Sequence, residues 1–152
     1  MRMIDWPILW MPVFSMVLIY LAWKDLKYLF IDSRDLVVVM LFTLTNQGYL
    51  LFSHDVRYVL WNIAGALFSL AVFFLLWQIT KKKGIGEGEW RIAPLIFINI
   101  GFINTLEAMY FSFVLAAIFA AGGLIMRKFS RRQRLPFLPF IALGVFISFF
   151  FP

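Results

Sequence analysis

The sequence predicts an all-α integral membrane protein, built as a bundle of about six transmembrane helices. Hydrophobic residues make up 63% of the 152 positions, and the mean hydropathy is +0.89. Soluble domains average about 45–50% apolar residues. The charged residues fall mostly between long apolar runs. Because lipid cannot satisfy free backbone polar groups, these runs are expected to be helices.

Six spans are predicted, each judged against the roughly 20 residues that cross about 30 Å of hydrocarbon. The apolar stretch 92–126 would extend about 52 Å as one helix, so it must turn back. Four residues mark the expected break: Gly101, Asn104, Thr105 and Glu107. The predicted spans are 6–23, 36–52, 58–79, 92–103, 106–126 and 136–151. We expect a single membrane-embedded domain over 1–152, with the first span retained.

The distribution of lysine and arginine predicts the orientation in the membrane. Twelve of these residues fall in the links after the first, third and fifth spans, whereas Arg2 and Arg57 lie on the other side. Cytoplasmic loops carry the excess of positive charge. We therefore predict a multi-pass protein of the cell's inner (cytoplasmic) membrane, with both termini outside. The bilayer then accounts for the net charge of +6, and no nucleic-acid partner is expected.

Two motifs place carboxylates at predicted cytoplasmic ends of spans. One is Asp25-Leu26-Lys27-Tyr28-Leu29-Phe30-Ile31-Asp32, and the other is Gly84-Ile85-Gly86-Glu87-Gly88-Glu89-Trp90-Arg91-Ile92. The second is interpreted as a flexible loop entering a helix. A simpler alternative is a helix N-terminus, where acidic side chains complement the helix dipole. An aspartyl-type peptidase that acts at a membrane boundary requires at least two carboxylates close together.

The sequence offers few ligands for a metal. It has no cysteine, which excludes a thiolate site, and its one histidine, His54, falls in a polar link. A carboxylate site built from Asp25, Glu87 and Glu89 is a minor alternative. We expect neither a metal nor another cofactor.

At these motifs the chain resembles the type IV prepilin peptidases and preflagellin peptidases, which are membrane aspartyl proteases with a Gly-x-Gly-Asp motif. Here the motif is Gly86-Glu87-Gly88-Glu89, with glutamate in place of the aspartate, followed by Trp90-Arg91-Ile92. The family's earlier aspartate motif is matched by Asp25-x-Lys27-x-x-x-Ile31, where Asp32 replaces a proline. A third block is similar to the segment that opens the family's last helix: Leu135-Pro136-Phe137-Leu138-Pro139-Phe140. The resemblance covers nearly the whole chain and implies a minimal form without the family's cysteine-bearing cytoplasmic domain.

The resemblance implies that Asp25 and Glu89 are the catalytic pair of a prepilin leader peptidase. Two carboxylates within a few ångströms would share one proton, activate water and polarise the scissile carbonyl. The implied partner is a prepilin-like or preflagellin-like membrane protein with a basic cytoplasmic leader. The motif residues implied around the pair are Gly84, Gly86, Glu87, Gly88, Arg91 and Lys27. Asp32 and Asp35 are possible leader-binding acids.

Two other functions remain open at this point. A catalytically degenerate homologue would bind prepilin-like helices without cleaving them, which the glutamate at position 89 favours. A small membrane transporter is less expected, because transporters place key polar groups near the middle of the bilayer.

The predicted orientation can be tested by labelling single cysteines, since the chain has none of its own. With both termini outside, Ser53→Cys should react with an impermeant reagent in intact cells. Ser130→Cys should react only after the membrane has been opened. The reverse pattern would contradict the orientation.

Overall fold

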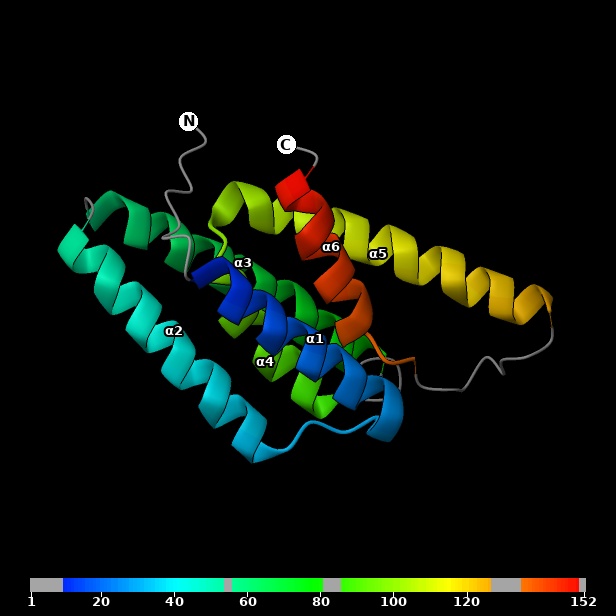
Figure 1. The fold of residues 1–152 in the computed structure, drawn as a ribbon. Coiled ribbons are helices and arrows are strands. Elements are labelled where there is room, and N and C mark those ends of the chain that lie inside the picture. The colour runs from blue at the N-terminus through cyan, green and yellow to red at the C-terminus, as the bar shows by residue number, and fades with distance from the viewer. Residues whose placement is uncertain (1–9, 54–55, 81–85, 127–134, 151–152) are drawn as a thin grey trace.

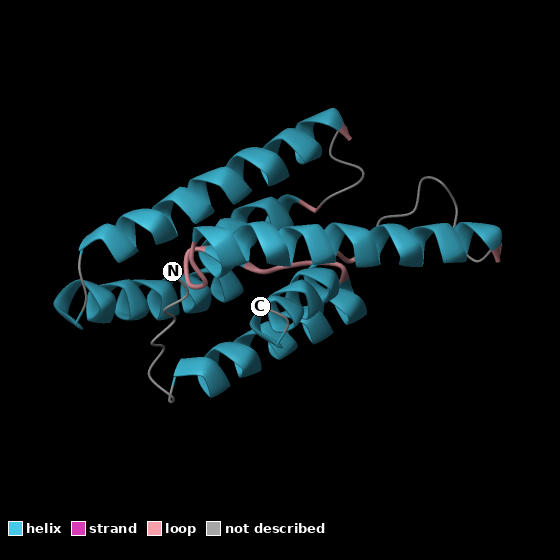
Figure 2. Cartoon of the chain, turned by 90° about the horizontal axis from the view of Figure 1, so that it is seen from above, coloured by secondary structure: helices cyan, strands magenta, loops and turns pink. Residues whose placement is uncertain are grey.

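The computed structural model describes residues 10–53, 56–80, 86–126 and 135–150, which form six helices (Figure 1). They are α1 (Trp10–Tyr28), α2 (Ser33–Ser53), α3 (Val56–Ile79), α4 (Glu87–Phe97), α5 (Phe102–Ile125) and α6 (Leu138–Phe150). Figure 2 shows helices and loops but no strand in this part of the chain. The predicted all-α class is therefore confirmed. Three of the helices, α2, α3 and α5, are long and apolar enough to cross a membrane.

Two of the helix boundaries that differ from the prediction concern the candidate site. Helix α1 continues to Tyr28 instead of ending at 23, and α4 begins at Glu87 instead of 92. Asp25 and Glu89 therefore lie inside helices rather than in links. The interpretation of 84–88 as a flexible loop was wrong for residues 87 and 88, which are helical. The prediction ended the first helix before Asp25 and began the fourth after Glu89. In the structure, tertiary contacts allow the two residues to be buried within the bundle.

Helices α4 and α6 are shorter than a membrane crossing. Their 11 and 13 residues extend about 16 and about 20 Å, against about 30 Å of hydrocarbon. The predicted break after α4 is confirmed, but it lies at 98–101 and not at 104–105. Of the four residues that marked it, Gly101 lies in the break, whereas Asn104, Thr105 and Glu107 are already helical. Gly101 has a φ of 80°, in the left-handed region that favours glycine.

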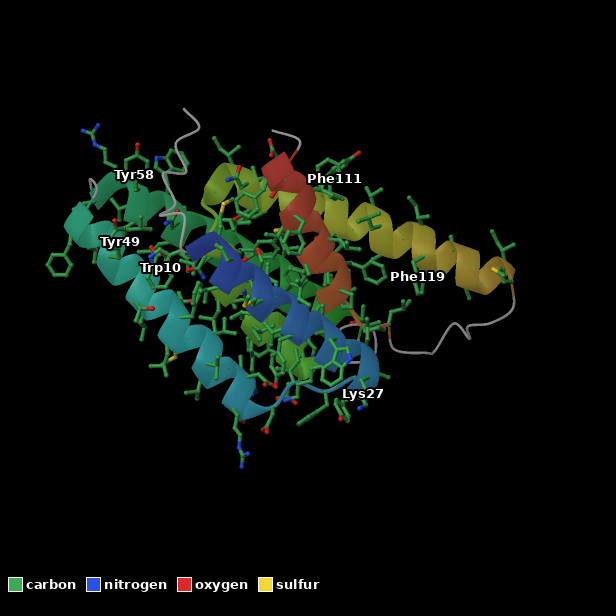
Figure 3. The ribbon with its side chains drawn as sticks, viewed as in Figure 1. Trp10, Lys27, Tyr49, Tyr58, Phe111 and Phe119 are labelled. Atoms are coloured by element: carbon green, nitrogen blue, oxygen red, sulfur yellow. The ribbon has the colours of Figure 1, made fainter. Side chains whose placement is uncertain are left out.

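Helix α4 supplies much of the buried core. Its apolar residues Ile92, Ala93, Ile96 and Phe97 are all 0–1% exposed, and the helix packs against α3 and α2. By contrast, many large apolar residues on the outer faces of the bundle are exposed, as the protruding side chains of Figure 3 show. This pattern suits a protein whose outer surface is solvated by lipid.

The C-terminal end of α4 is held by polar side chains of α2. The Asn46 amide donates to Asn99 Oδ1 at 2.9 Å, and Asn99 Nδ2 donates to Thr43 Oγ1 at 3.0 Å and the Leu95 carbonyl at 2.7 Å. Gln47 Nε2 donates to the Ile98 carbonyl at 3.0 Å. These bonds satisfy polar groups at a helix end where lipid could not. They fix α4 against α2.

Helix α6 packs between α1 and α5. A Cβ added at Gly144 would collide with Ser112 Oγ and the Ala108 carbonyl, so glycine is required where α6 crosses α5. At the start of α6, the Phe137 ring lies 5.1 Å from Phe113 and 5.5 Å from Phe73, centroid to centroid. The aromatic contacts therefore fix the N-terminus of α6.

This crossing predicts that Gly144→Ala lowers the stability of the bundle. The added methyl group has no room, and overpacking costs about 1–3 kcal/mol. Gly122→Ala on α5 is the matched control, because nothing lies within 4 Å of a Cβ there. Thermal unfolding in detergent should show a lower midpoint for Gly144→Ala and no decrease for Gly122→Ala. Equal midpoints would contradict the close crossing.

Candidate active site

Asp25 lies in the last turns of α1 and is 1% exposed. Its Oδ2 atom accepts a hydrogen bond from the Leu138 backbone amide at 3.1 Å. Leu138 is the first residue of α6. Burying a carboxylate is costly unless donors replace the lost water, and here the start of α6 supplies one.

Glu89 is the third residue of α4 and is 3% exposed. Its Oε2 atom accepts from the Gly86 backbone amide at 2.8 Å, and its Oε1 atom accepts from the Phe137 amide at 3.2 Å. A glutamate at this position commonly reaches back to the amide that precedes its helix. The side chain therefore caps α4 with one oxygen and contacts the start of α6 with the other.

The two carboxylates thus meet at one point, the N-terminus of α6. The amides of a helix's first turn lack intrahelical partners, and the helix dipole favours negative charge there. Pro139 has no amide hydrogen, and the Phe140 amide bonds to the Phe137 carbonyl at 3.0 Å. The donors that need partners are therefore those of Phe137 and Leu138. These consecutive amides bind Glu89 and Asp25 respectively.

The second glycine of the motif is explained by a close approach. A Cβ on Gly88 would lie 2.6 Å from Cβ of Ile31, in the link between α1 and α2. Gly86 has φ −67° and ψ 151°, an extended conformation open to any residue. Gly84 lies outside the described residues. Gly88 therefore lets the 29–32 link pack directly against the start of α4.

A cleft of about 160 Å³ borders the two carboxylates. One wall is formed by Leu29, Phe30 and Ile31, and the other by the 86–89 segment. Asp25 and Glu89 both line it. The cleft brings together the two acids and the glycine motif that the sequence analysis singled out.

The other charged residues of the motifs make contacts of their own. Glu87 Oε1 accepts from Arg91 Nη2 at 2.7 Å, and both side chains are largely exposed. Lys27 Nζ lies 5.1 Å from the ring centroids of Trp23 and of Tyr28. Figure 3 shows Lys27 at the C-terminal end of α1, away from Tyr49 and Tyr58 at the other end of the bundle. These contacts suit a polar end of the bundle.

The two acids suggested for leader binding have structural contacts. Asp35 is 5% exposed, and its Oδ2 accepts from Lys24 Nζ at 2.5 Å and from the Asp32 amide at 2.9 Å. The Asp32 carbonyl in turn accepts from the Asp35 amide at 3.0 Å. Asp35 therefore ties the start of α2 to α1.

Among the described residues, no group of three or more His, Asp or Glu side chains could hold a metal ion. The alternative metal site built from Asp25, Glu87 and Glu89 would need Glu87 as a ligand. In the structure, the exposed Glu87 side chain forms a salt bridge with Arg91.

Sequence reasoning missed the amides of Phe137 and Leu138 and the contact of Ile31 with Gly88. Backbone donors carry no residue-type signal. The prolines at 136 and 139 were the available clue, because they frame a short segment that opens a helix.

Comparisons with known proteins agree with the motif resemblance. The chain is 28% identical over 141 residues to the prepilin leader peptidase/N-methyltransferase of Bacillus subtilis (strain 168), covering 91% of this chain and 54% of the relative. It is 25% identical over 141 residues to the protein of that name from Aeromonas salmonicida (strain A449), covering 88% and 48% respectively. The chain therefore spans about half the length of the curated relatives it matches. No protein-family model matches the chain, and no solved structure matches it significantly. The similarity over about nine-tenths of this chain supports the resemblance to the prepilin peptidase family.

Proposed function

We propose that this chain is a membrane aspartyl-type endopeptidase that removes the basic cytoplasmic leader from prepilin-like proteins. The observation that carries the proposal is the hydrogen bonding of Glu89 and Asp25 to the consecutive amides of Phe137 and Leu138. Both acids are buried, come from different helices and border one cleft. The names of the curated relatives support prepilin as the substrate class.

The proposed mechanism uses the pair as one unit. Two buried carboxylates side by side cannot both carry a charge cheaply, so they hold one proton between them. The ionised member takes a proton from a water molecule as that water attacks the scissile carbonyl carbon. The protonated member donates to the carbonyl oxygen. When the C–N bond breaks, a proton passes from the pair to the leaving amine. The pair titrates together, so neither residue has a fixed role.

The cleft is small, with a volume of about 160 Å³, and both carboxylates border it. We expect the substrate to place an extended segment and the attacking water in this space.

A second candidate function follows from the bond between Glu89 Oε2 and the Gly86 amide. This bond caps α4 and would stabilise the helix whether or not the residue takes part in catalysis. A non-catalytic homologue that binds prepilin-like helices would keep the same arrangement. Variants of Glu89 distinguish the two functions.

We expect Glu89→Gln to lower cleavage of a prepilin-like substrate at least about 100-fold, because the amide cannot share or transfer the proton. Asp25→Asn should have the same effect. Glu89→Asp should retain more activity than Glu89→Gln, because it keeps the carboxyl group while moving it by about 1.5 Å, within the range where misplacement costs rate. Cleavage would be followed by gel shift of substrate reconstituted with the purified protein.

Glu87→Gln serves as the comparison within the motif, and Glu107→Gln on α5 serves as a control outside it. Full activity of Glu89→Gln together with loss of activity in Glu87→Gln would assign the second acid to Glu87. If the wild-type protein and Glu89→Asp bind the substrate but cleave none of it, the non-catalytic function is correct.

A further inference from the structure

Leu29 has an unusual backbone conformation at the edge of the cleft. Its φ is 51°, and it is the non-glycine residue with positive φ in the described part of the chain. Its amide donates to the Asp25 carbonyl at 2.9 Å, so it ends α1 in a left-handed cap. Glycine or asparagine adopts this conformation more readily than a leucine does. A leucine here is unfavourable for the backbone alone.

The location of the Leu29 side chain gives a reason for a leucine at this position. It lines the cleft beside Asp25, one helical turn further along the chain, and it is 42% exposed rather than packed in the core. A strained backbone at the edge of a site is a reason to look for a function of its side chain. Glycine at this position would relieve the backbone and enlarge the cleft.

The wall that contains Leu29 is fixed in place. Ile31, two residues further on, is 8% exposed and contacts Gly88 on the opposite wall. The amide of Asp32 is held by the buried carboxylate of Asp35 at 2.9 Å. The 29–32 link therefore cannot widen the cleft without breaking these contacts. The Leu29 side chain is therefore one of the apolar groups, with Phe30 and Ile31, that border the space next to the carboxylates.

We propose that Leu29 is a specificity-determining residue, whose side chain restricts the substrate residue beside the scissile bond to a small one. The inference rests on the proposed function and adds the residue that limits the size of the substrate side chain at the cleavage site. Each methylene that a filled apolar pocket must accommodate changes discrimination by about 10-fold or more. Removing the Leu29 side chain should therefore relax the size limit measurably.

The test compares Leu29→Gly, Leu29→Asn and Leu29→Met in the full chain, reconstituted with a cleavable prepilin-like substrate. The residue on the leader side of the cut, and in a second series the residue after it, is varied among Gly, Ala and Val. We expect Leu29→Gly to raise the Val-to-Gly ratio of kcat/KM at least about tenfold in one series. Leu29→Met, which keeps the volume, should leave both ratios within about twofold of the wild type.

Two further measurements separate the effect of the Leu29 side chain from the effect of its backbone conformation. Leu29→Asn relieves the left-handed backbone but keeps a branched side chain, so its ratio should stay nearer to that of Leu29→Met than to that of Leu29→Gly. Thermal unfolding should show that Leu29→Gly is at least as stable as the wild type. A large loss of stability would assign Leu29 to packing and overturn the inference.

The outcomes also separate this inference from the proposed function. If wild type cleaves the substrate but Leu29→Gly leaves both ratios unchanged, the specificity role is wrong and the peptidase function stands. If Leu29→Asn relaxes the ratio as much as Leu29→Gly, backbone freedom and not side-chain size sets the limit. If wild type cleaves no prepilin-like substrate, the proposed function fails and this inference fails with it.

Discussion

The arrangement of the candidate site depends on the unpaired amides at the N-terminus of α6. Phe137 and Leu138 have no intrahelical acceptors there, and the carboxylates of Glu89 and Asp25 provide them. The interaction works in both directions. The helix end makes it possible to bury two acids, and the acids satisfy a helix end that lies inside the bundle. Three helices from distant parts of the chain are joined at this point.

The rest of the fold holds these three helices in position. The Asn46, Asn99 and Gln47 amides anchor the far end of α4 to α2, so the short helix that carries Glu89 is fixed at its C-terminus as well. Hydrogen bonds between membrane helices contribute about 0.6–2 kcal/mol each. On the other side, Gly144 lets α6 lie directly against α5, and the ring of Phe137 packs against Phe73 and Phe113. The aromatic packing thus sets the position of the amide that Glu89 accepts from.

Much of the fold could be predicted from the sequence, because apolar runs separated by charged links identify the helices. The prediction was wrong for the two charged residues that lie inside helices. Asp25 and Glu89 were placed just outside the predicted spans, because those spans were bounded by the apolar runs. The partners that make them acceptable include backbone amides at the start of α6, more than a hundred residues from Asp25 in the chain. The glycine at 88 was recognised, whereas its cause, the contact with Ile31, depends on tertiary packing. The roles of the two acids stay a prediction.

The most direct test of this account measures whether positions 25 and 89 are neighbours in the membrane. The chain has no cysteine, so Asp25→Cys combined with Glu89→Cys can be treated with a short bifunctional thiol reagent in native membranes. A matched pair combines Asp25→Cys with Ile125→Cys, at the end of α5 that Figure 1 shows well away from α1. The account predicts intramolecular cross-linking of the 25/89 pair and none of the 25/125 pair. A folded 25/89 variant that does not cross-link, while the 25/125 pair does, would contradict it.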